Sequence, residues 1–206
     1  MTNESPVIYI VDDDPSMRKF LRRLVSLSGL QSETFTSAEE FLHSVHPDTP
    51  GCLLLDVMMP GLSGLDLQEA LARAGSPLPV IFLSGHGDIP TTVQVMRGGA
   101  EDFITKTAPK ENLIGAIKRA LKRDSDERST RARNKALRAP FELLTPRERE
   151  VLQHVVRGRL NKQIAYDLGI HERTVKLHRA GIMTKLRVQS TAELTRLWIE
   201  FGKTEA

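Results

Sequence analysis

The chain has 206 residues, of which 40% are hydrophobic and 27% are charged, which favours one or two globular domains and argues against wholesale disorder. The single cysteine excludes a disulfide scaffold and a zinc ribbon. No apolar run approaches the roughly 18 residues of a membrane span, and the N-terminus lacks the basic region of a signal peptide. We therefore expect a cytoplasmic protein. Residues 1–123 carry a net charge of −3 and residues 124–206 one of +6, which makes the second part a candidate to bind a polyanion, although a solvated basic surface is the alternative.

Short apolar runs rich in β-branched residues alternate with amphipathic helical patterns along residues 7–122. The pattern predicts buried strands at 7–11 and 52–56, a weaker strand at 31–35, and further strands at 80–83 and 102–104. A helix is predicted after each strand. The first begins at Asp14-Pro15 and the second at the capping box of Ser37 and Glu40. The other three cover residues 64–74, 89–97 and 109–122. This alternation predicts an α/β fold with a parallel sheet and helices on both of its faces.

A charged segment follows the last of these helices. Residues 123–139 (RDSDERSTRARNKALRA) hold almost no large apolar side chain. They predict a linker that is either flexible or a charged extension of the preceding helix. Arg, Lys, Ala and Glu tolerate helical conformation well, so we favour a partly helical linker that ends at Pro140.

Only helical patterns follow Pro140, and they predict an all-α domain over residues 141–206. Four helices are expected: one opened by the capping box of Thr145 and Glu148, one that Asn161 caps and Gly169 closes, one from about Glu172 to Arg187, and one opened by the box of Ser190 and Glu193.

Reactive side chains stand at the carboxyl ends of the predicted strands, which is where open parallel sheets bind their ligands. The first strand is followed by Asp12 and Asp13, the third ends in Asp56, the fourth is followed by Ser84, and the fifth by Lys106. Clustered carboxylates suit a hard divalent cation, and a carboxylate can attack phosphorus to give an aspartyl phosphate. Each residue alone has a plain structural reading as a turn, a cap or a solvated charge, but their joint placement at four strand ends favours a phosphoryl-transfer site.

Four motifs in this region resemble the receiver domains of two-component response regulators. They are VDDD at 11–14, LLLDVMMPGLSG at 53–64, LSGHGD at 83–88 and DFITK at 102–106. The resemblance covers about residues 5–122 and implies a five-stranded sheet of order 2-1-3-4-5.

The resemblance also implies a role for each acidic residue. Asp56 would be the phosphoacceptor, with Asp12 and Asp13 as the acidic pair beside it. Asp13, Asp56 and the backbone carbonyl of Met58 would hold Mg²⁺ or Mn²⁺, and Asp12 would contact the ion through water.

The remaining receiver roles fall on the fourth and fifth strands. Ser84 would hydrogen-bond a phosphoryl oxygen, Lys106 would form an ion pair with it, and Phe103 would be the aromatic switch residue that moves inward with Ser84. The family normally has a proline with a cis peptide after the lysine, whereas this chain has Thr107. A cis bond costs about 2.5–4 kcal/mol before a residue other than proline, so we expect a trans bond and a lysine that still reaches Asp56.

The two central helices of the second domain have the spacing of a helix-turn-helix, with helix 161–168, a turn at 169–171 and a second helix from Glu172. By periodicity Val175, Ile182 and Leu186 face inward, and the other face carries Arg173, Lys176, Leu177, Ala180 and Thr184. Residues near the start of such a helix reach base edges of DNA. A basic four-helix module that binds protein is the alternative.

The sequence from LTPREREVL to MTKLRV, within about residues 141–203, resembles the LuxR-type helix-turn-helix of the FixJ/NarL subfamily. The resemblance implies that Lys176, Leu177 and Ala180 lie in the major groove of double-stranded promoter DNA. Residues expected to hold mostly phosphates are Lys162, Thr174 and His178. His171 stands where the family commonly has a serine, which weakens the expected helix cap.

Together these expectations describe a phosphorylation-controlled transcription regulator. Its partners would be a sensor histidine kinase, promoter DNA and RNA polymerase, and phosphorylated Asp56 would rearrange residues of about 89–122 into a face that forms a homodimer. Two alternatives stay open at this point. One is a magnesium-dependent phosphohydrolase that uses Asp56, and the other is an adaptor that binds partners without phosphorylation.

Overall fold

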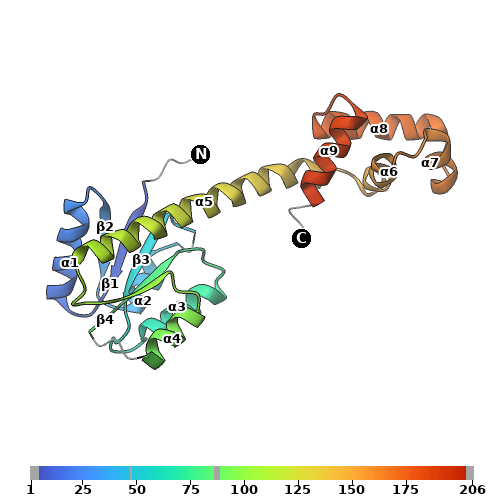
Figure 1. The fold of residues 1–206 in the computed structure, drawn as a ribbon. Coiled ribbons are helices and arrows are strands. Elements are labelled where there is room, and N and C mark those ends of the chain that lie inside the picture. Colours follow the sequence, from blue (N-terminus) through green and yellow to red (C-terminus); the bar gives the residue numbers. More distant parts are fainter. Residues whose placement is uncertain (1–4, 47, 86–88, 203–206) are drawn as a thin grey trace. The chain divides into compact units, whose positions relative to one another are not determined.

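Five parallel strands form the centre of the first part of the chain in the computed structural model, which describes residues 5–46, 48–85 and 89–202 (Figure 1). The strands are β1 (Val7–Val11), β2 (Gln31–Phe35), β3 (Gly51–Asp56), β4 (Val80–Ser84) and β5 (Asp102–Thr105). Their order across the sheet is β2-β1-β3-β4-β5, and every neighbouring pair is parallel. The predicted fold class is therefore confirmed, although residues 86–88 of the motif LSGHGD lie outside the described residues.

Helices cover both faces of this sheet (Figure 1). One face carries α1 (Pro15–Leu27) and α5 (Lys110–Glu142), and the other carries α2 (Ala38–Ser44), α3 (Gly64–Arg73) and α4 (Ile89–Arg97). Two hydrophobic layers result, because the strands alternate their side chains between the faces. Leu21 and Ile117 belong to the first layer, and Phe41, Leu67 and Val95 to the second.

β3 is the central strand, and all six of its residues are buried. Its last residue, Asp56, therefore stands at the carboxyl edge of the sheet between β1 and β4. Close packing after the strand requires a glycine, since a Cβ on Gly64 would lie 2.2 Å from the carbonyl oxygen of Asp56. The first turn of α3 can approach the phosphoacceptor candidate only because that side chain is absent.

The helix after β5 continues into the charged segment, which is the form of the linker that the sequence favours, but it does not end at Pro140. α5 runs without a break from Lys110 to Glu142. Most residues of 123–139 are Arg, Lys, Ala, Glu or Leu, which form helices well, and two pairs one turn apart support the helix, Arg123 with Glu127 and Asp124 with Arg128. Pro140 falls two residues before the helix ends, so the hydrogen bond that it removes lies in the last turn.

The chain divides into two compact units between Arg128 and Ser129. The second unit contains α6 (Pro146–Val156), α7 (Asn161–Leu168), α8 (Glu172–Leu186) and α9 (Thr191–Gly202). Its core is closed by an aromatic group in which the ring of Phe141 stacks on that of Phe201, 4.2 Å between centroids, beside Trp198.

One predicted cap is wrong. Leu160 is the N-cap of α7, and Asn161 is the first helical residue rather than the cap. The amide of Gln163 accepts a hydrogen bond from the backbone N–H of Leu160 at 3.0 Å, and the Asn161 side chain turns to Arg179. A local capping pattern does not show that a side chain of another helix, here Arg179, can bind the predicted cap residue instead.

No helix in the described part of the chain is both long enough and apolar enough to cross a membrane.

Glu148 ties the start of α6 to α8. Its carboxylate accepts hydrogen bonds from the backbone N–H of Thr145 at 2.8 Å and from the ammonium of Lys185 at 2.7 Å, while only 9% of the side chain is exposed. Burial acts to raise the pKa of Glu148, but Lys185 and Thr145 outweigh it and bring the pKa below the ordinary value of 4.5.

The Glu148 carboxylate should therefore stabilise the second unit in a pH-dependent way. A lowered pKa in the folded state gives stability that is fully present above pH 4.5 and is lost as the pH falls through the folded-state pKa. We expect Glu148→Gln to lower the free energy of unfolding by about 1–2 kcal/mol at pH 7, with a smaller difference below pH 4.5. Denaturation followed by the fluorescence of Trp198, the single tryptophan, reports on this unit alone. A difference that stays constant from pH 7 to pH 3 would contradict the assignment.

Candidate functional site

Three carboxylates meet at the carboxyl edge of the sheet. One oxygen from each of Asp12, Asp13 and Asp56 lies within 4.8 Å of the other two. They meet because β1 and β3 are neighbours, so that the residues after β1 stand beside the last residue of β3. Asp12 and Asp56 are buried, whereas Asp13 is exposed. The backbone N–H of Asp14 donates to Oδ1 of Asp12 at 2.9 Å and orients that carboxylate.

Lys106 inserts its ammonium between two of these carboxylates. Its Nζ lies 2.8 Å from Oδ2 of Asp56, with hydrogen-bond geometry, and 2.8 Å from Oδ2 of Asp12, as an ion pair without that geometry. The backbone N–H of Lys106 donates to the carbonyl of Ser84 at 2.7 Å, which fixes the loop after β5 to the end of β4. The described residues contain no cis peptide bond, so Lys106 reaches Asp56 with a trans bond before Thr107, as the sequence predicts.

The electrostatics of this cluster follow from burial and from like charge. Burial raises the pKa of the Asp56 carboxyl above its ordinary value of 3.8, and Asp12 adds to the rise, while Lys106 opposes it. Burial of the Lys106 ammonium acts to lower its pKa, but its close contacts with the carboxylates of Asp12 and Asp56 outweigh burial and raise the pKa. The site thus sets one ammonium, paired with two carboxylates, in a cluster of three carboxylates.

The donor set fits a hard divalent cation. Three carboxylates supply oxygen ligands, and neutralisation by a cation would favour the ionised form of Asp56, which is the nucleophilic form. The described residues hold no other group of three or more acidic, histidine or cysteine side chains with this spacing. The acidic pocket is therefore consistent with a divalent metal site.

The other residues predicted for this site lie around the same edge. Ser84 ends β4 with 6% of its surface exposed, and it is paired in register with Thr105 of β5. Phe103 of β5 is half-buried and packs against the layer that contains α4. The backbone N–H of Met58 donates to Oδ1 of Asp56 at 3.4 Å, while the Met58 side chain is 77% exposed.

Arg18 is a neighbour of the site that the sequence did not indicate. From the first turn of α1, its guanidinium donates to the backbone carbonyl of Asp12 at 2.5 Å. This contact fastens the start of α1 to the end of β1 beside the carboxylates. The available sequence signal was an arginine close after the acidic pair. Spacing alone does not distinguish Arg18 from the other basic residues of α1.

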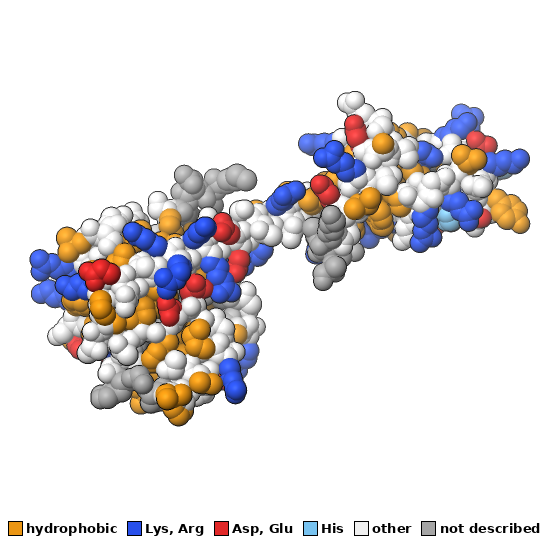
Figure 2. Space-filling view, in the orientation of Figure 1, with side chains coloured by type: hydrophobic (Ala, Val, Ile, Leu, Met, Phe, Trp, Pro, Cys, Tyr) orange, Lys and Arg blue, Asp and Glu red, His pale blue; other side chains and the backbone are white. Residues whose placement is uncertain are grey.

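The second unit presents a charged and exposed helix face. α7 and α8 form the predicted helix-turn-helix, and α8 buries Val175, Ile182 and Leu186 in the core. The residues predicted to contact DNA all retain exposed surface: Lys162, Arg173, Lys176, Leu177 and Ala180 are exposed, and Thr174 and His178 are half-buried. Lys and Arg side chains are spread over the visible surface of this unit (Figure 2).

Arg179 is a second residue that sequence reasoning missed. Its guanidinium donates to the side-chain oxygen of Asn161 at 2.9 Å and to the hydroxyl of Thr191 at 2.9 Å. These partners are the first residues of α7 and α9, so Arg179 of α8 holds the starts of both neighbouring helices. The geometry identifies it as a residue that positions α8 within the unit.

Comparison with known proteins matches both units. The response regulator receiver domain family matches residues 8–118, and the luxR family of bacterial regulatory proteins matches residues 142–198. The response regulator protein TodT of Pseudomonas putida is 47% identical over 197 residues, which cover 96% of this chain and 87% of TodT. The transcriptional regulatory protein FixJ of Azorhizobium caulinodans is 39% identical over 203 residues, which cover 98% of this chain and 96% of that protein.

Solved structures give the same result over the whole chain. The response regulator StyR is 44% identical with a TM-score of 0.88, and the match covers 96% of this chain and 100% of StyR. Full-length FixJ from B. japonicum is 35% identical with a TM-score of 0.58, and the match covers 96% and 98% of the two chains. These relatives set aside the phosphohydrolase alternative, because they are regulators rather than enzymes. The chain belongs to the two-component response regulators that join a receiver domain with an acidic pocket to a DNA-binding LuxR-type helix-turn-helix.

Proposed function

We propose that Asp56 accepts a phosphoryl group from a sensor histidine kinase and that this event controls binding of the protein to promoter DNA. The observation that carries the proposal is the ammonium of Lys106 at 2.8 Å from both Asp56 and Asp12, at the edge where three carboxylates meet. A carboxylate that only ends a strand would not need a lysine and two further carboxylates beside it. The membership of the chain in the response regulators supplies the class of donor.

The chemistry follows from the charges at the site. An ionised oxygen of Asp56 attacks the phosphorus of a phosphohistidine, the new oxygen–phosphorus bond forms, and the nitrogen–phosphorus bond breaks with its electron pair on the imidazole. The Lys106 ammonium then pairs with a phosphoryl oxygen, and the Ser84 hydroxyl donates to another. A bound Mg²⁺ or Mn²⁺ supplies charge neutralisation between carboxylate and phosphoryl oxygens.

The ligands proposed for the ion are those that the cluster offers. Asp13, Asp56 and the backbone carbonyl of Met58 would hold it directly, and Asp12 would contact it through water. The movement of Ser84 toward the phosphoryl group would open space for Phe103, which lies half-buried on the adjacent strand.

Phosphorylation gives the first test of this proposal. Asp56→Asn should abolish incorporation of an acid-labile phosphoryl group from a kinase or a small phosphodonor, because the amide lacks the nucleophilic oxygen. Removal of divalent cations should stop labelling of the wild-type chain, since carboxylates and phosphate then repel one another. Labelling is measured with radioactive donor or intact-protein mass.

Glu69→Gln is the matched control, because Glu69 is an exposed carboxylate on α3, outside the cluster. It should label as the wild type does. Full labelling of Asp56→Asn would overturn the assignment of the phosphoacceptor.

We assign the domains as a receiver at 5–122, a charged linker at 123–140 and a DNA-binding domain at 141–206.

We propose that the receiver dimerises through the face formed by α4, β5 and the start of α5. Three apolar side chains of α4 support this face, since Ile89 is 78%, Val93 43% and Met96 44% exposed. Exposed apolar groups gathered on one short helix are typical of an interaction surface.

Oligomeric state tests this face directly. A phosphodonor with Mg²⁺ should shift the wild-type chain from monomer toward dimer in sedimentation or light scattering, and Ile89→Ser should weaken that shift. Leu27→Ser is the matched control, because Leu27 on α1 is also 78% exposed but lies away from the proposed face. Equal dimerisation of the wild type and Ile89→Ser would refute the role of α4.

We assign DNA recognition to α8, which would enter the major groove with Lys176, Leu177 and Ala180, flanked by Arg173. The groups proposed at phosphates are Lys162, Thr174 and His178. The exposure of these residues and the match to the luxR family support the assignment. The proposed partners are promoter DNA and, in transcription, RNA polymerase, and the proposed location is the cytoplasm.

Affinity for DNA tests the face. Lys176→Ala should cost about 1–3 kcal/mol of specific binding if the ammonium contacts a base, because one side of a base-specific hydrogen bond is lost. A phosphate contact would instead weaken binding to all sequences equally and make the salt dependence shallower. Arg196→Ala, an exposed cation on α9, is the control for net charge. Unchanged affinity and salt dependence in Lys176→Ala would exclude this face.

A further inference from the structure

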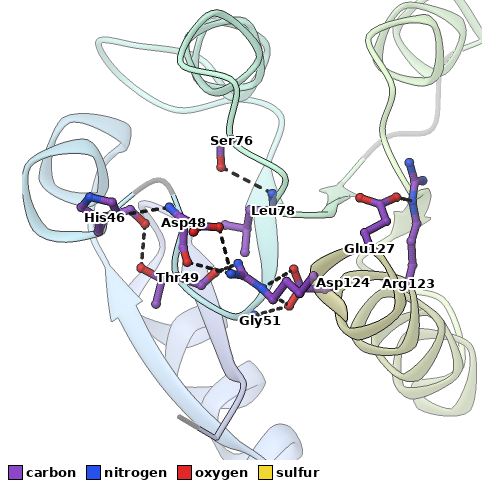
Figure 3. Close-up of polar contacts among 10 residues, drawn as sticks. His46, Asp48, Thr49, Gly51, Ser76, Leu78, Arg123, Asp124 and Glu127 are labelled. Carbon is purple, nitrogen blue, oxygen red and sulfur yellow. Dashed lines mark hydrogen bonds and ion pairs between the residues drawn. The ribbon is translucent and has the colours of Figure 1, made fainter. Parts of the chain in front are cut away.

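A buried carboxylate lies on α5 at the opposite end of β3 from the acidic site. The side chain of Asp124 is 3% exposed, although most residues around it on the helix are exposed or half-buried. One of its oxygens accepts a hydrogen bond from the backbone N–H of Gly51 at 3.0 Å, and both accept from Nε of Arg128, at 2.8 and 2.9 Å. Figure 3 shows Asp124 facing Gly51, Thr49 and Asp48 from across the end of the sheet.

Arg128 uses the rest of its guanidinium to grip the loop before β3. One terminal nitrogen donates to the carbonyl of Asp48 at 2.8 Å and to its carboxylate at 3.0 Å, and the other donates to the carbonyl of Thr49 at 2.5 Å. The loop presents these carbonyls in a fixed way, because both the N–H and the hydroxyl of Thr49 donate to the carbonyl of His46.

Gly51 makes this contact possible. It has a φ of 145°, and a Cβ there would lie 1.9 Å from the carbonyl oxygen of Val7. The first residue of the central strand can therefore approach β1 and still turn its N–H to Asp124.

These contacts lie where the helix leaves the receiver. Arg128 is the last residue of the first unit, and no residue from 125 to 140 is buried. Helical segments of this length without a buried face are marginal in water, because the first turn is costly to form. Residues 129–139 nevertheless continue the helix.

We propose that Asp124 and Arg128 form a clamp that anchors the end of the receiver and holds the last turn from which the linker helix continues. The packed turns of α5 already meet the nucleation cost. A fixed last turn keeps the helix from fraying back toward the receiver, so that each further residue adds to an existing helix. The clamp thereby sets whether the linker is a stiff helix or a flexible chain, which decides how freely the DNA-binding domain moves. This role is independent of the proposed phosphorylation of Asp56.

A purely local role is the alternative, in which the buried pair stabilises the receiver and the linker keeps its helix unaided. Hydrogen exchange of the backbone amides of residues 129–138 in the full-length protein separates the two. Arg128→Ala should lower the protection of these amides at least tenfold relative to the wild type. Trypsin should also cleave the arginine-rich linker faster.

Arg123→Ala is the matched control. Arg123 is one turn earlier on the same helix and forms two ion pairs, with Glu101 and Glu127, but its side chain is 53% exposed and does not touch the loop. It should leave the protection of residues 129–138 within about threefold of the wild type, since exposed pairs contribute little.

Arg128→Ala leaves the Asp124 carboxylate buried without its cation, which can unfold the receiver itself. The double variant Asp124→Asn, Arg128→Ala avoids this, because the asparagine oxygen can still accept from Gly51. It should keep the slow exchange of the sheet amides of β1 and β3 and lose protection in residues 129–138. Wild-type protection of the linker in either folded variant, or an equal loss in Arg123→Ala, would overturn the proposal.

Discussion

Two buried carboxylates that share one ammonium are the interaction on which the receiver depends. Asp12 and Asp56 come from neighbouring strands, and each lies 2.8 Å from the Nζ of Lys106. Like charges this close repel one another, and Lys106 supplies a single cation to a cluster of three carboxylates. These groups meet because the carboxyl ends of β1, β3 and β5 lie at the same edge of the parallel sheet. A bound divalent cation would add positive charge to this cluster, and a phosphoryl group on Asp56 would add negative charge to it.

The long helix α5 connects this receiver to the rest of the chain in three successive roles. Its first turns bury Leu113 and Ile117 against the sheet, and its middle bears Asp124 and Arg128. Residues 125–140 then form a charged segment without buried residues, before Phe141 joins the core of the second unit. β3 ends in Asp56 and begins with Gly51, whose backbone N–H donates a hydrogen bond to the carboxylate of Asp124. A single buried strand thus touches both the acidic site and the start of the linker.

Most of the fold and of the acidic site could be predicted from the sequence, because the signals were local. The strand ends placed Asp12, Asp56 and Lys106 together as soon as the strands were known to be parallel, and the helix-turn-helix followed from apolar spacing. The misses were long-range. Arg128 binds a loop 80 positions away in sequence, and Asn161 turns to Arg179 on another helix. No local pattern contains such partners.

We propose that phosphorylation of Asp56 controls DNA binding by the second unit. The most direct measurement is the affinity of the full-length protein for its promoter DNA, with and without a phosphodonor, at constant Mg²⁺ and salt, in the wild type and in Asp56→Asn. The phosphodonor should tighten binding by the wild type and have no effect on the variant. Equal affinities for the wild type in the two conditions, or the same tightening in Asp56→Asn, would contradict it.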